Sequence, residues 1–269
     1  MKAVLLTGNH PRHIYLINLL NKNKLLNGVV MQTRENHFPE PDENLPDRIK
    51  YLHKKHFSNR LDAENEIFGY EDLFDKKNLS IKNSNDLNDS ETIDFINNLK
   101  PKLIISFGID VLSSNTITSL SCEIWNLHGG LSPDFKGAIT HFWPTYLLKP
   151  QFTGCTIHLL RPKIDAGEII HQTGAVINKG DNLHMLSCKT LKEGFYFLNK
   201  LIKLYLEGCE IETYPQKRTG KLWQKKDWSP YNLELIYDLY DDSIVDLYID
   251  GKLGNVKPYL ITNKIFDEY

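Results

Sequence analysis

Residues 125–172 read WNLHGGLSPDFKGAITHFWPTYLLKPQFTGCTIHLLRPKIDAGEIIHQ, and this stretch holds the groups that decide the expected fold and chemistry of the chain. Asn126 and His128 end an apolar run, and residues two apart in a strand project to the same face, so both can point into one site. Asp165 lies in a loop two residues before Gly167. An amide that donates to an oxyanion, an imidazole that donates or moves a proton, and a carboxylate that orients them can together serve acyl transfer to an amine.

Each of these residues also has an ordinary structural interpretation. Asn126 alone could be a buried amide that satisfies the backbone, and His128 alone could be a half-buried histidine with its hydrogen bonds made. Asp165 before Ala166-Gly167 could be a plain turn residue. His158, on a neighbouring strand pattern, reads as a structural histidine. A shared catalytic role for Asn126, His128 and Asp165 is favoured over three separate structural roles, because the three residues appear together in one order.

Four motifs follow one another in this region, and their order and spacing resemble those of the folate-dependent formyltransferases. That group holds the glycinamide ribonucleotide, methionyl-tRNA and sugar N-formyltransferases. The resemblance is clearest over residues 103–208 and weaker over residues 1–34, and Gly130 stands where the family often has Ser. The motifs are Asn126-x-His128, Leu131-x-Pro133-x-Phe135-x-Gly137, Thr153-Gly154-x-Thr156-Ile157-His158 and Asp165-x-Gly167-x-Ile169-Ile170.

The resemblance implies 10-formyltetrahydrofolate as co-substrate and no metal. Asn126 and His128 would then stabilise the tetrahedral oxyanion, while Asp165 pairs with His128 and accepts the proton that leaves the amine. The family's pterin pocket is built largely from backbone groups. The matching positions here are Ile109, Asp110, Val111 and Leu112 after one strand, and Gly130, Leu131, Ser132 and Pro133 after another. The alternative for the second set is a loop that only closes a strand-to-helix connection.

Short apolar runs separated by helical patterns predict an α/β fold with a Rossmann-like open, mostly parallel sheet of the formyltransferase type. Residues 3–7, 28–31 and 103–107 suit buried parallel strands, and Pro11 suits the start of the first helix. Gly8 stands without the GxGxxG pattern, which argues against dinucleotide binding. Ligands in such sheets lie beyond the carboxyl ends of strands, so the loop after Phe107 is expected to line a pocket.

The chain divides into an expected catalytic domain, residues 1–209, and a small C-terminal unit for substrate binding or dimerisation, residues 210–269. A long amphipathic pattern over residues 183–206 predicts a helix that Gly208 ends. In the tail, Asp250-Gly251 between apolar runs predicts a β-hairpin, and a hairpin there favours a homodimer. Residues 48–53 and 61–74 could form helices, and residues 35–87 are expected to be helical packing material or a substrate lid. Residues 92–99 predict a further helix, which Pro101 ends.

The overall composition limits the partners. The net charge of −2 gives no broad nucleic-acid footprint, and no apolar run approaches transmembrane length. The four cysteines show no CxxC pairing, which fits reduced thiols and argues against a zinc site. We therefore expect a cytoplasmic protein that binds neither nucleic acid nor membrane.

Three formyl acceptors compete. The short acidic tail fits the sugar N-formyltransferases best, so the expected acceptor is the amine of a UDP- or dTDP-linked amino-deoxy sugar, with pseudaminic acid modification as one specific case. Trp223 and Lys225 could stack a base and meet a diphosphate, or form a solvated turn with one anchoring Trp. The alternatives are phosphoribosylglycinamide formyl transfer, hydrolysis of 10-formyltetrahydrofolate, and a catalytically silent folate-binding module.

Overall fold

A seven-stranded sheet forms the centre of the computed structural model, which describes residues 2–33, 38–69 and 79–267. The strand order is β3-β2-β1-β4-β5-β7-β8, and only β5–β7 and β7–β8 pair antiparallel. This arrangement confirms the predicted Rossmann-like, mostly parallel sheet. The strands of this sheet are β1 (Ala3–Thr7), β2 (Leu26–Gln32), β3 (Ser80–Ser84), β4 (Leu103–Phe107), β5 (Ile124–His128), β7 (Cys155–Leu159) and β8 (Ile169–Thr173).

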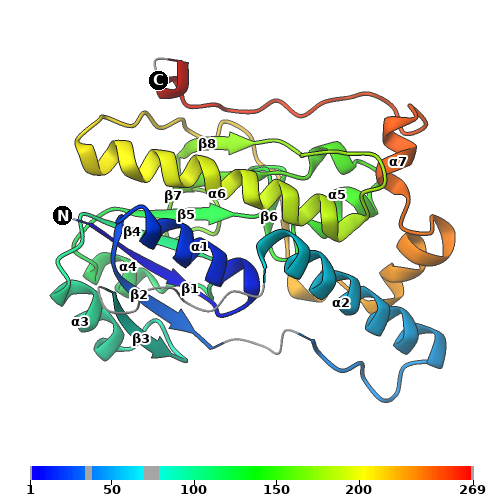
Figure 1. Ribbon diagram of the computed structural model, residues 1–269, viewed down its shortest axis with the longest axis horizontal. Coiled ribbons are helices and arrows are strands. Elements are labelled where there is room, and N and C mark those ends of the chain that lie inside the picture. The colour runs from blue at the N-terminus through cyan, green and yellow to red at the C-terminus, as the bar shows by residue number, and fades with distance from the viewer. Residues whose placement is uncertain (1, 34–37, 70–78, 268–269) are drawn as a thin grey trace.

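Helices cover both faces of the sheet, as Figure 1 shows. The side chains of Leu5, Ile105 and Leu127 pack toward α1 and α6, whereas those of Val4, Ile104 and Ile124 pack toward α3 and α4. Asn126 alternates with its strand neighbours and therefore lies on the α3/α4 face. The helices are α1 (Pro11–Lys22), α2 (Asp47–Phe68), α3 (Ser90–Asn98), α4 (Ser114–Ser119), α5 (Phe142–Tyr146), α6 (Leu183–Glu207) and α7 (Ile244–Ile249).

The long helix α6 begins and ends where the sequence predicts. The Asn182 side chain accepts a hydrogen bond from the Met185 N–H, and Gly208 ends the helix in the left-handed region with φ of 101°. Phe195, Leu198 and Leu201 are fully buried against the sheet. Removal of this apolar face from water is the main source of the helix's stability, because isolated helices are marginal in water.

Between residues 47 and 69, one helix stands where two were expected. The patterns at residues 48–53 and 61–68 belong to the continuous helix α2, which packs against α6, while residues 70–74 lie outside the described residues. Strand β3 and helix α3 follow along the chain. The helical packing interpretation is thus the one that the contacts between α2 and α6 favour.

The predicted hairpin at Asp250-Gly251 is wrong. The apolar run before it forms α7, in which Ile244 and Val245 are buried, and Gly251 lies in the turn after this helix with φ of 76°. Packing of Ile244 on the aromatic side chains of α5 overrides the strand propensity of the run. The expectation of a dimer therefore loses the feature on which it rested.

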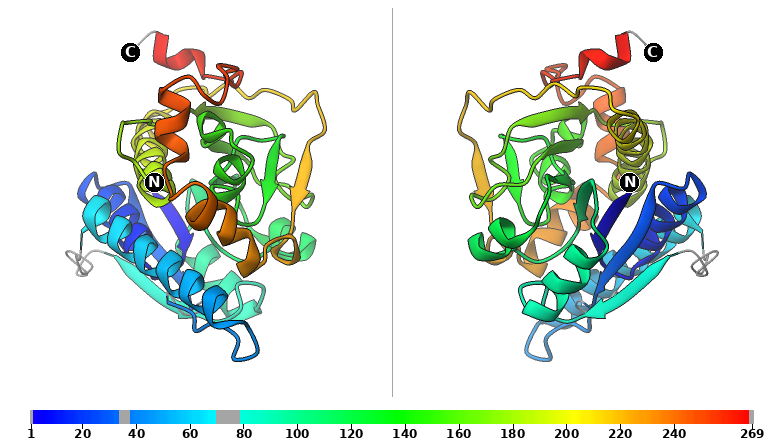
Figure 2. Two further views of the ribbon diagram at one scale, coloured as in Figure 1. Left: turned by 90° about the vertical axis from the view of Figure 1, so that its right-hand side faces the viewer. Right: turned by 90° about the vertical axis from the view of Figure 1, so that its left-hand side faces the viewer.

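The C-terminal segment instead pairs with the body of the molecule at two places. Strand β9 (Lys221–Trp223) pairs in parallel with β6 (Phe135–Gly137), and Ile261 accepts a hydrogen bond from the Gln172 N–H of β8. Figure 2 shows this segment, coloured yellow to red, running around the outside of the molecule. It also holds the short turns Lys225–Asp227, Pro230–Asn232 and Lys264–Asp267 and the π-helical turn Glu234–Leu239. The division between residues 209 and 210 stays a prediction.

No helix among the described residues is both long and apolar enough to cross a bilayer.

Candidate active site

The three predicted catalytic residues lie together at the carboxyl end of β5. Strand β5 carries Asn126 and His128, and the antiparallel register of β7 places His158 opposite Asn126. Asp165 comes from the loop between β7 and β8, where its backbone adopts a φ of +46°. A Cβ atom at Gly167 would lie 1.7 Å from the Leu159 carbonyl oxygen, so only glycine lets this loop fold back onto the sheet. The loop thereby brings the Asp165 carboxylate over the strand ends.

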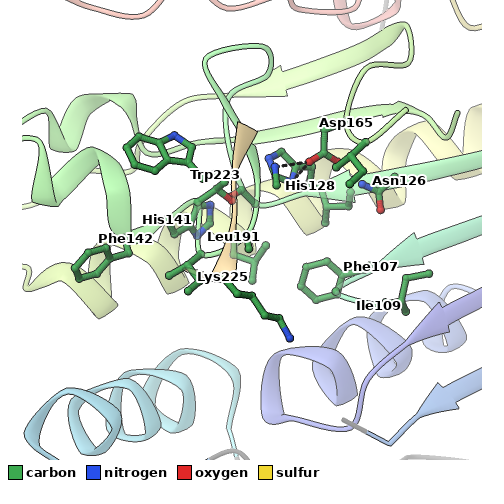
Figure 3. Close-up of a pocket in the computed structure, with 18 of the residues that line it drawn as sticks. Phe107, Ile109, Asn126, His128, His141, Phe142, Asp165, Leu191, Trp223 and Lys225 are labelled. Atoms are coloured by element: carbon green, nitrogen blue, oxygen red, sulfur yellow. Dashed lines mark hydrogen bonds and ion pairs between the residues drawn. The ribbon is translucent and has the colours of Figure 1, made fainter. Parts of the chain in front are cut away.

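Asp165 is the centre of this group. Its Oδ2 accepts a hydrogen bond from the Gly137 N–H at 2.7 Å and lies 3.4 Å from His128 Nδ1, while its Oδ1 lies 3.3 Å from His158 Nε2. Burial alone would raise the pKa of the Asp165 carboxyl, but the neighbouring His128 and His158 imidazoles and the Gly137 N–H hold that pKa well below its usual range. The carboxylate is therefore ionised at neutral pH. Figure 3 shows His128 and Asp165 joined beside Asn126.

The Asn126 amide has a defined orientation. Ser106 Oγ donates to Asn126 Oδ1 at 2.8 Å, and Asn126 Nδ2 lies 3.1 Å from His158 Nε2. His158 Nδ1 donates to the Leu159 carbonyl at 2.8 Å, so the ring is held with Nε2 facing both the Asn126 amide and the Asp165 carboxylate. Asn126 lines the cavity, so its second N–H is the group that can donate to an oxyanion there.

His128 is held from both sides by the protein. Its Nε2 donates to the buried Phe135 carbonyl oxygen at 2.6 Å, and its Nδ1 faces Asp165. A Cβ at Gly130 would lie 2.4 Å from the Phe135 oxygen and 2.6 Å from His128 Nε2, so glycine is what leaves room for this ring position. In this arrangement the His128 ring acts on a ligand through Asp165. Its Nε2–H can donate directly to an oxyanion only after the hydrogen bond to the Phe135 carbonyl breaks.

One cavity of about 680 Å³ extends from this group around the carboxyl ends of β4 and β5. The predicted cofactor residues Ile109, Asp110, Val111 and Leu112 all line it. The second predicted set, Gly130, Leu131, Ser132 and Pro133, does not line this cavity. Those residues are buried behind the wall, where the Ser132 N–H donates to Thr156 Oγ1 at 2.9 Å, and the alternative of a loop-closing role describes them better.

Arg12 and the lining residues of α2 and α6 were not predicted from the sequence. The same holds for residues 137–141, Leu160, Arg161, Pro162, Ile164 and His158. Two sequence signals were available for some of these residues. Gly137 ends the second motif, and residues 160–164 precede Asp165 in the loop that carries the carboxylate. The contact of His158 with Asn126 depends on the antiparallel register of β7, which no local pattern encodes.

Trp223 and Lys225 also line the cavity, but Trp223 does not offer a free ring face. Its indole ring stacks on that of Trp143, with the two ring centroids 4.2 Å apart. The Lys221 ammonium makes a second contact with the Trp223 ring and lies 3.5 Å from its centroid. These contacts occupy the ring, so the predicted base stacking on Trp223 is replaced by a structural role in the cavity wall. Figure 3 shows the Lys225 side chain extending from the same segment toward the space below His128.

No group of three or more His, Cys, Asp or Glu side chains within the described ranges is arranged to hold a metal ion.

A family model described as Formyl transferase matches residues 3–201. Among curated proteins, the bifunctional polymyxin resistance protein ArnA of Wigglesworthia glossinidia brevipalpis is 29% identical over 160 residues, which cover 55% of this chain and 24% of that protein. A methionyl-tRNA formyltransferase of Leptospira interrogans is 32% identical over 161 residues, covering 55% of this chain and 48% of that protein. The chain therefore spans half or less of the length of these curated relatives.

Solved structures share the fold at low sequence identity. The formyltransferase PseJ of Anoxybacillus kamchatkensis, in complex with UDP-4,6-dideoxy-4-formamido-L-AltNAc and tetrahydrofolate, has a TM-score of 0.51 and 21% identity, over 90% of this chain and 95% of that one. An N-formyltransferase of Helicobacter canadensis, with folinic acid and dTDP-3-aminofucose, has a TM-score of 0.55 and 17% identity, over 85% and 73%. Phosphoribosylglycinamide formyltransferase of Anaplasma phagocytophilum has a TM-score of 0.55 and 16% identity, over 84% and 98%.

Proposed function

Because the chain belongs to the formyl transferase family, we propose that it transfers the formyl group of 10-formyltetrahydrofolate to the amine of a nucleotide-linked amino-deoxy sugar. The observation that carries this proposal is the hydrogen-bonded group of Asn126, His128, His158 and Asp165 at the edge of one large cavity. An oriented amide N–H next to an ionised carboxylate is what acyl transfer to an amine requires.

The reaction begins when the neutral amine attacks the formyl carbon. The carbonyl electron pair moves to oxygen, and the Asn126 N–H that faces the cavity donates to this oxyanion. The amine loses a proton to Asp165, directly or through water. The electron pair on the oxyanion then re-forms the carbonyl while the carbon–N10 bond breaks, and N10 takes up a proton. Because the pKa of Asp165 is depressed, the carboxyl is a weak proton store and passes the proton on rather than keeping it.

The folate is assigned to the lobe of the cavity on the α3/α4 side of the sheet. Ile109, Leu112 and Leu160 line this lobe and belong to the apolar cluster on that face. The other residues assigned to it are Asp110, Val111, Arg161, Pro162 and Ile164. Apolar side chains and exposed backbone groups suit a flat heterocycle such as the pterin. In this position the formyl group would lie next to Asn126. No metal takes part in the proposed reaction.

Two observations support a sugar as the acceptor. PseJ, solved with a UDP-linked formamido sugar, matches over 90% of this chain and 95% of its own. Residues 222–225, which follow the part matched by the family model, line the cavity, so the C-terminal segment can select the acceptor. A glycinamide ribonucleotide acceptor is the alternative, because an enzyme that formylates it shares the fold with a TM-score of 0.55.

The proposal is tested by incubating the protein with 10-formyltetrahydrofolate and a panel of UDP- and dTDP-linked amino-deoxy sugars, with glycinamide ribonucleotide alongside. Mass spectrometry of the products should reveal a formyl increment on one amino sugar, which also identifies the nucleotide and the amine. An increment on glycinamide ribonucleotide alone would replace the proposed acceptor. Formate release without any formylated amine would indicate a hydrolase, and no reaction of the folate would indicate a binding module.

A further inference from the structure

Two arginines share one carboxylate in the wall of the cavity on the α1/α6 side of the sheet. Arg12, at the start of α1, forms an ion pair with Glu64 of α2, and Arg60 Nε lies 3.0 Å from the same Glu64 Oε1. The Glu64 side chain is 3% exposed, whereas those of Arg12 and Arg60 keep 19% and 25% of their surface. All three line the cavity. This arginine cluster (Arg12, Arg60 and Glu64) therefore carries one net positive charge.

Among the described residues, two histidines and one cysteine pack near the cluster, and none of the three offsets its charge. Burial and the neighbouring Arg60 lower the pKa of His56 to about 3, and burial together with His56 also lowers the pKa of His184, so both rings are neutral at pH 7. Burial raises the pKa of the Cys188 thiol to about 12, so it is neutral as well. Lys225 also lines the cavity.

An unmatched positive charge in a buried setting is costly, and burial lowers the pKa of Arg12 in agreement with this cost. An anion in the cavity would offset it. Guanidinium groups match phosphate oxygens in geometry and donate two parallel hydrogen bonds, whereas an ammonium group acts as a point charge.

We propose that the arginine cluster binds the diphosphate of the acceptor nucleotide, an inference that rests on the proposed function. The cluster and the assigned folate lobe lie on opposite faces of the sheet. Asn126 and Ile109–Leu112 are on the α3/α4 side, and Phe107 and Leu127, which line the same cavity, belong to the apolar cluster on the α1/α6 side. An acceptor with its amine at Asn126 and its phosphates at the cluster would leave the folate lobe free.

Binding of free UDP, free dTDP and inorganic pyrophosphate, measured by calorimetry, tests this inference without any formyl transfer. Arg60→Gln leaves the Arg12–Glu64 ion pair but removes the net charge, and it should weaken binding of all three probes roughly tenfold to a hundredfold. Arg60→Lys keeps the charge without the paired hydrogen bonds and should lose less. Glu64→Gln raises the net charge and should tighten binding. Arg48→Gln, which breaks an exposed ion pair with Asp238 outside the cavity, is the matched control and should change nothing.

Tetrahydrofolate is titrated into the same variants to separate the two anions that could occupy the cluster. Its affinity should be the same for wild type and Arg60→Gln. Loss of tetrahydrofolate affinity with nucleotide binding intact would assign the cluster to the folate's glutamate and overturn the inference. Weakening by both Arg60→Gln and Glu64→Gln would indicate a structural cluster and also overturn it, as would a wild-type protein that binds none of the probes. Formylation of a sugar tests the proposed function separately, since nucleotide binding does not depend on it.

Discussion

Ser106 Oγ donates a hydrogen bond to Asn126 Oδ1 at 2.8 Å, and this bond fixes which end of the Asn126 amide faces its neighbours. Ser106 lies on β4 and is fully buried, and the parallel register places it directly beside Asn126 on β5. With the amide oxygen held by Ser106, the amide nitrogen lies against His158 Nε2 and toward the cavity. Oxyanion stabilisation is thus prepared by a residue that does not itself line the cavity.

Ser106→Ala should lower kcat about tenfold, because the amide loses the hydrogen bond that holds its orientation. KM for the folate should stay unchanged, since Ser106 does not line the cavity. Steady-state kinetics with the identified acceptor measures both constants. Thr118→Ala, which removes an exposed hydroxyl that bonds only within α4, is the control and should behave as wild type. A higher KM for the folate together with an unchanged kcat would refute the positioning role of Ser106.

Gly167→Ala should abolish activity, with a loss of at least about a hundredfold, because a Cβ would meet the Leu159 carbonyl oxygen at 1.7 Å and the Asp165 loop would have to move. Gly174→Ala is the matched control, since its Cβ would meet only the flexible end of Leu260 at 3.1 Å. Circular dichroism should show the fold of both variants intact. Equal activity of the two would mean that the loop's path is not needed for catalysis.

Asp165→Asn should destabilise the protein in a pH-dependent way. The pKa of Asp165 is lowered in the folded state, so its ionised form contributes stability above the unfolded-state pKa of about 3.9, and this contribution is lost as the pH falls below that value. The difference in free energy of unfolding between wild type and variant should therefore be largest near pH 7 and shrink below about pH 4. Urea denaturation at several pH values measures it, and a difference that grows toward acid would contradict the assignment.

Asp242→Asn should stabilise the protein at pH 8. Burial raises the pKa of Asp242 to about 6, so the folded state favours the protonated form. Stability is therefore lost as the pH rises from the unfolded-state pKa of about 3.9 to the folded-state value, and the full cost is present above it. Asparagine can still accept the hydrogen bond from the Leu183 N–H and tolerates the φ of 52°. The gain should be on the order of 1–2 kcal/mol at pH 8 and vanish below about pH 4.

Asp241→Asn is the control for this change, because Asp241 is exposed and has a similar φ of 46°. Its melting temperature should follow wild type at every pH. If both variants gained stability equally, relief of repulsion between the two aspartates would explain the effect better than burial of one.

Much of the fold, and the position of Asn126 and His128 on one strand face, could be predicted because the sequence signals for them are local. Residues 103–107 form an apolar run that predicts a buried strand, and the alternation of side chains along β5 puts Asn126 and His128 on one face. The cap at Asn182 and the stop at Gly208 are encoded within a few residues of the helix ends. The link from Asp165 to this group came from the resemblance, and the structure brings the three residues together.

The remainder depends on contacts between distant segments. His158 meets Asn126 only through the register of an antiparallel pair, and the Trp223 ring is occupied by Trp143 from another element. The local pattern predicts a strand at Val245, although Ile244 and Val245 are buried in the helix α7, which contacts α6. Gly130 to Pro133 follow a strand end, as pocket residues do, but hydrogen bonds to β7 turn them inward.

Gly137 contacts both the C-terminal segment and Asp165. Its N–H donates to Asp165, and in strand β6 it is paired with Trp223 of β9. A ribosome that has made residues 1–209 has supplied every strand of the seven-stranded sheet, yet β6 still lacks its only partner strand among the described residues. The seven-stranded sheet of the growing polypeptide should therefore fold before the site can catalyse formyl transfer. Activity should appear late in translation, after Trp223 has left the ribosomal exit tunnel.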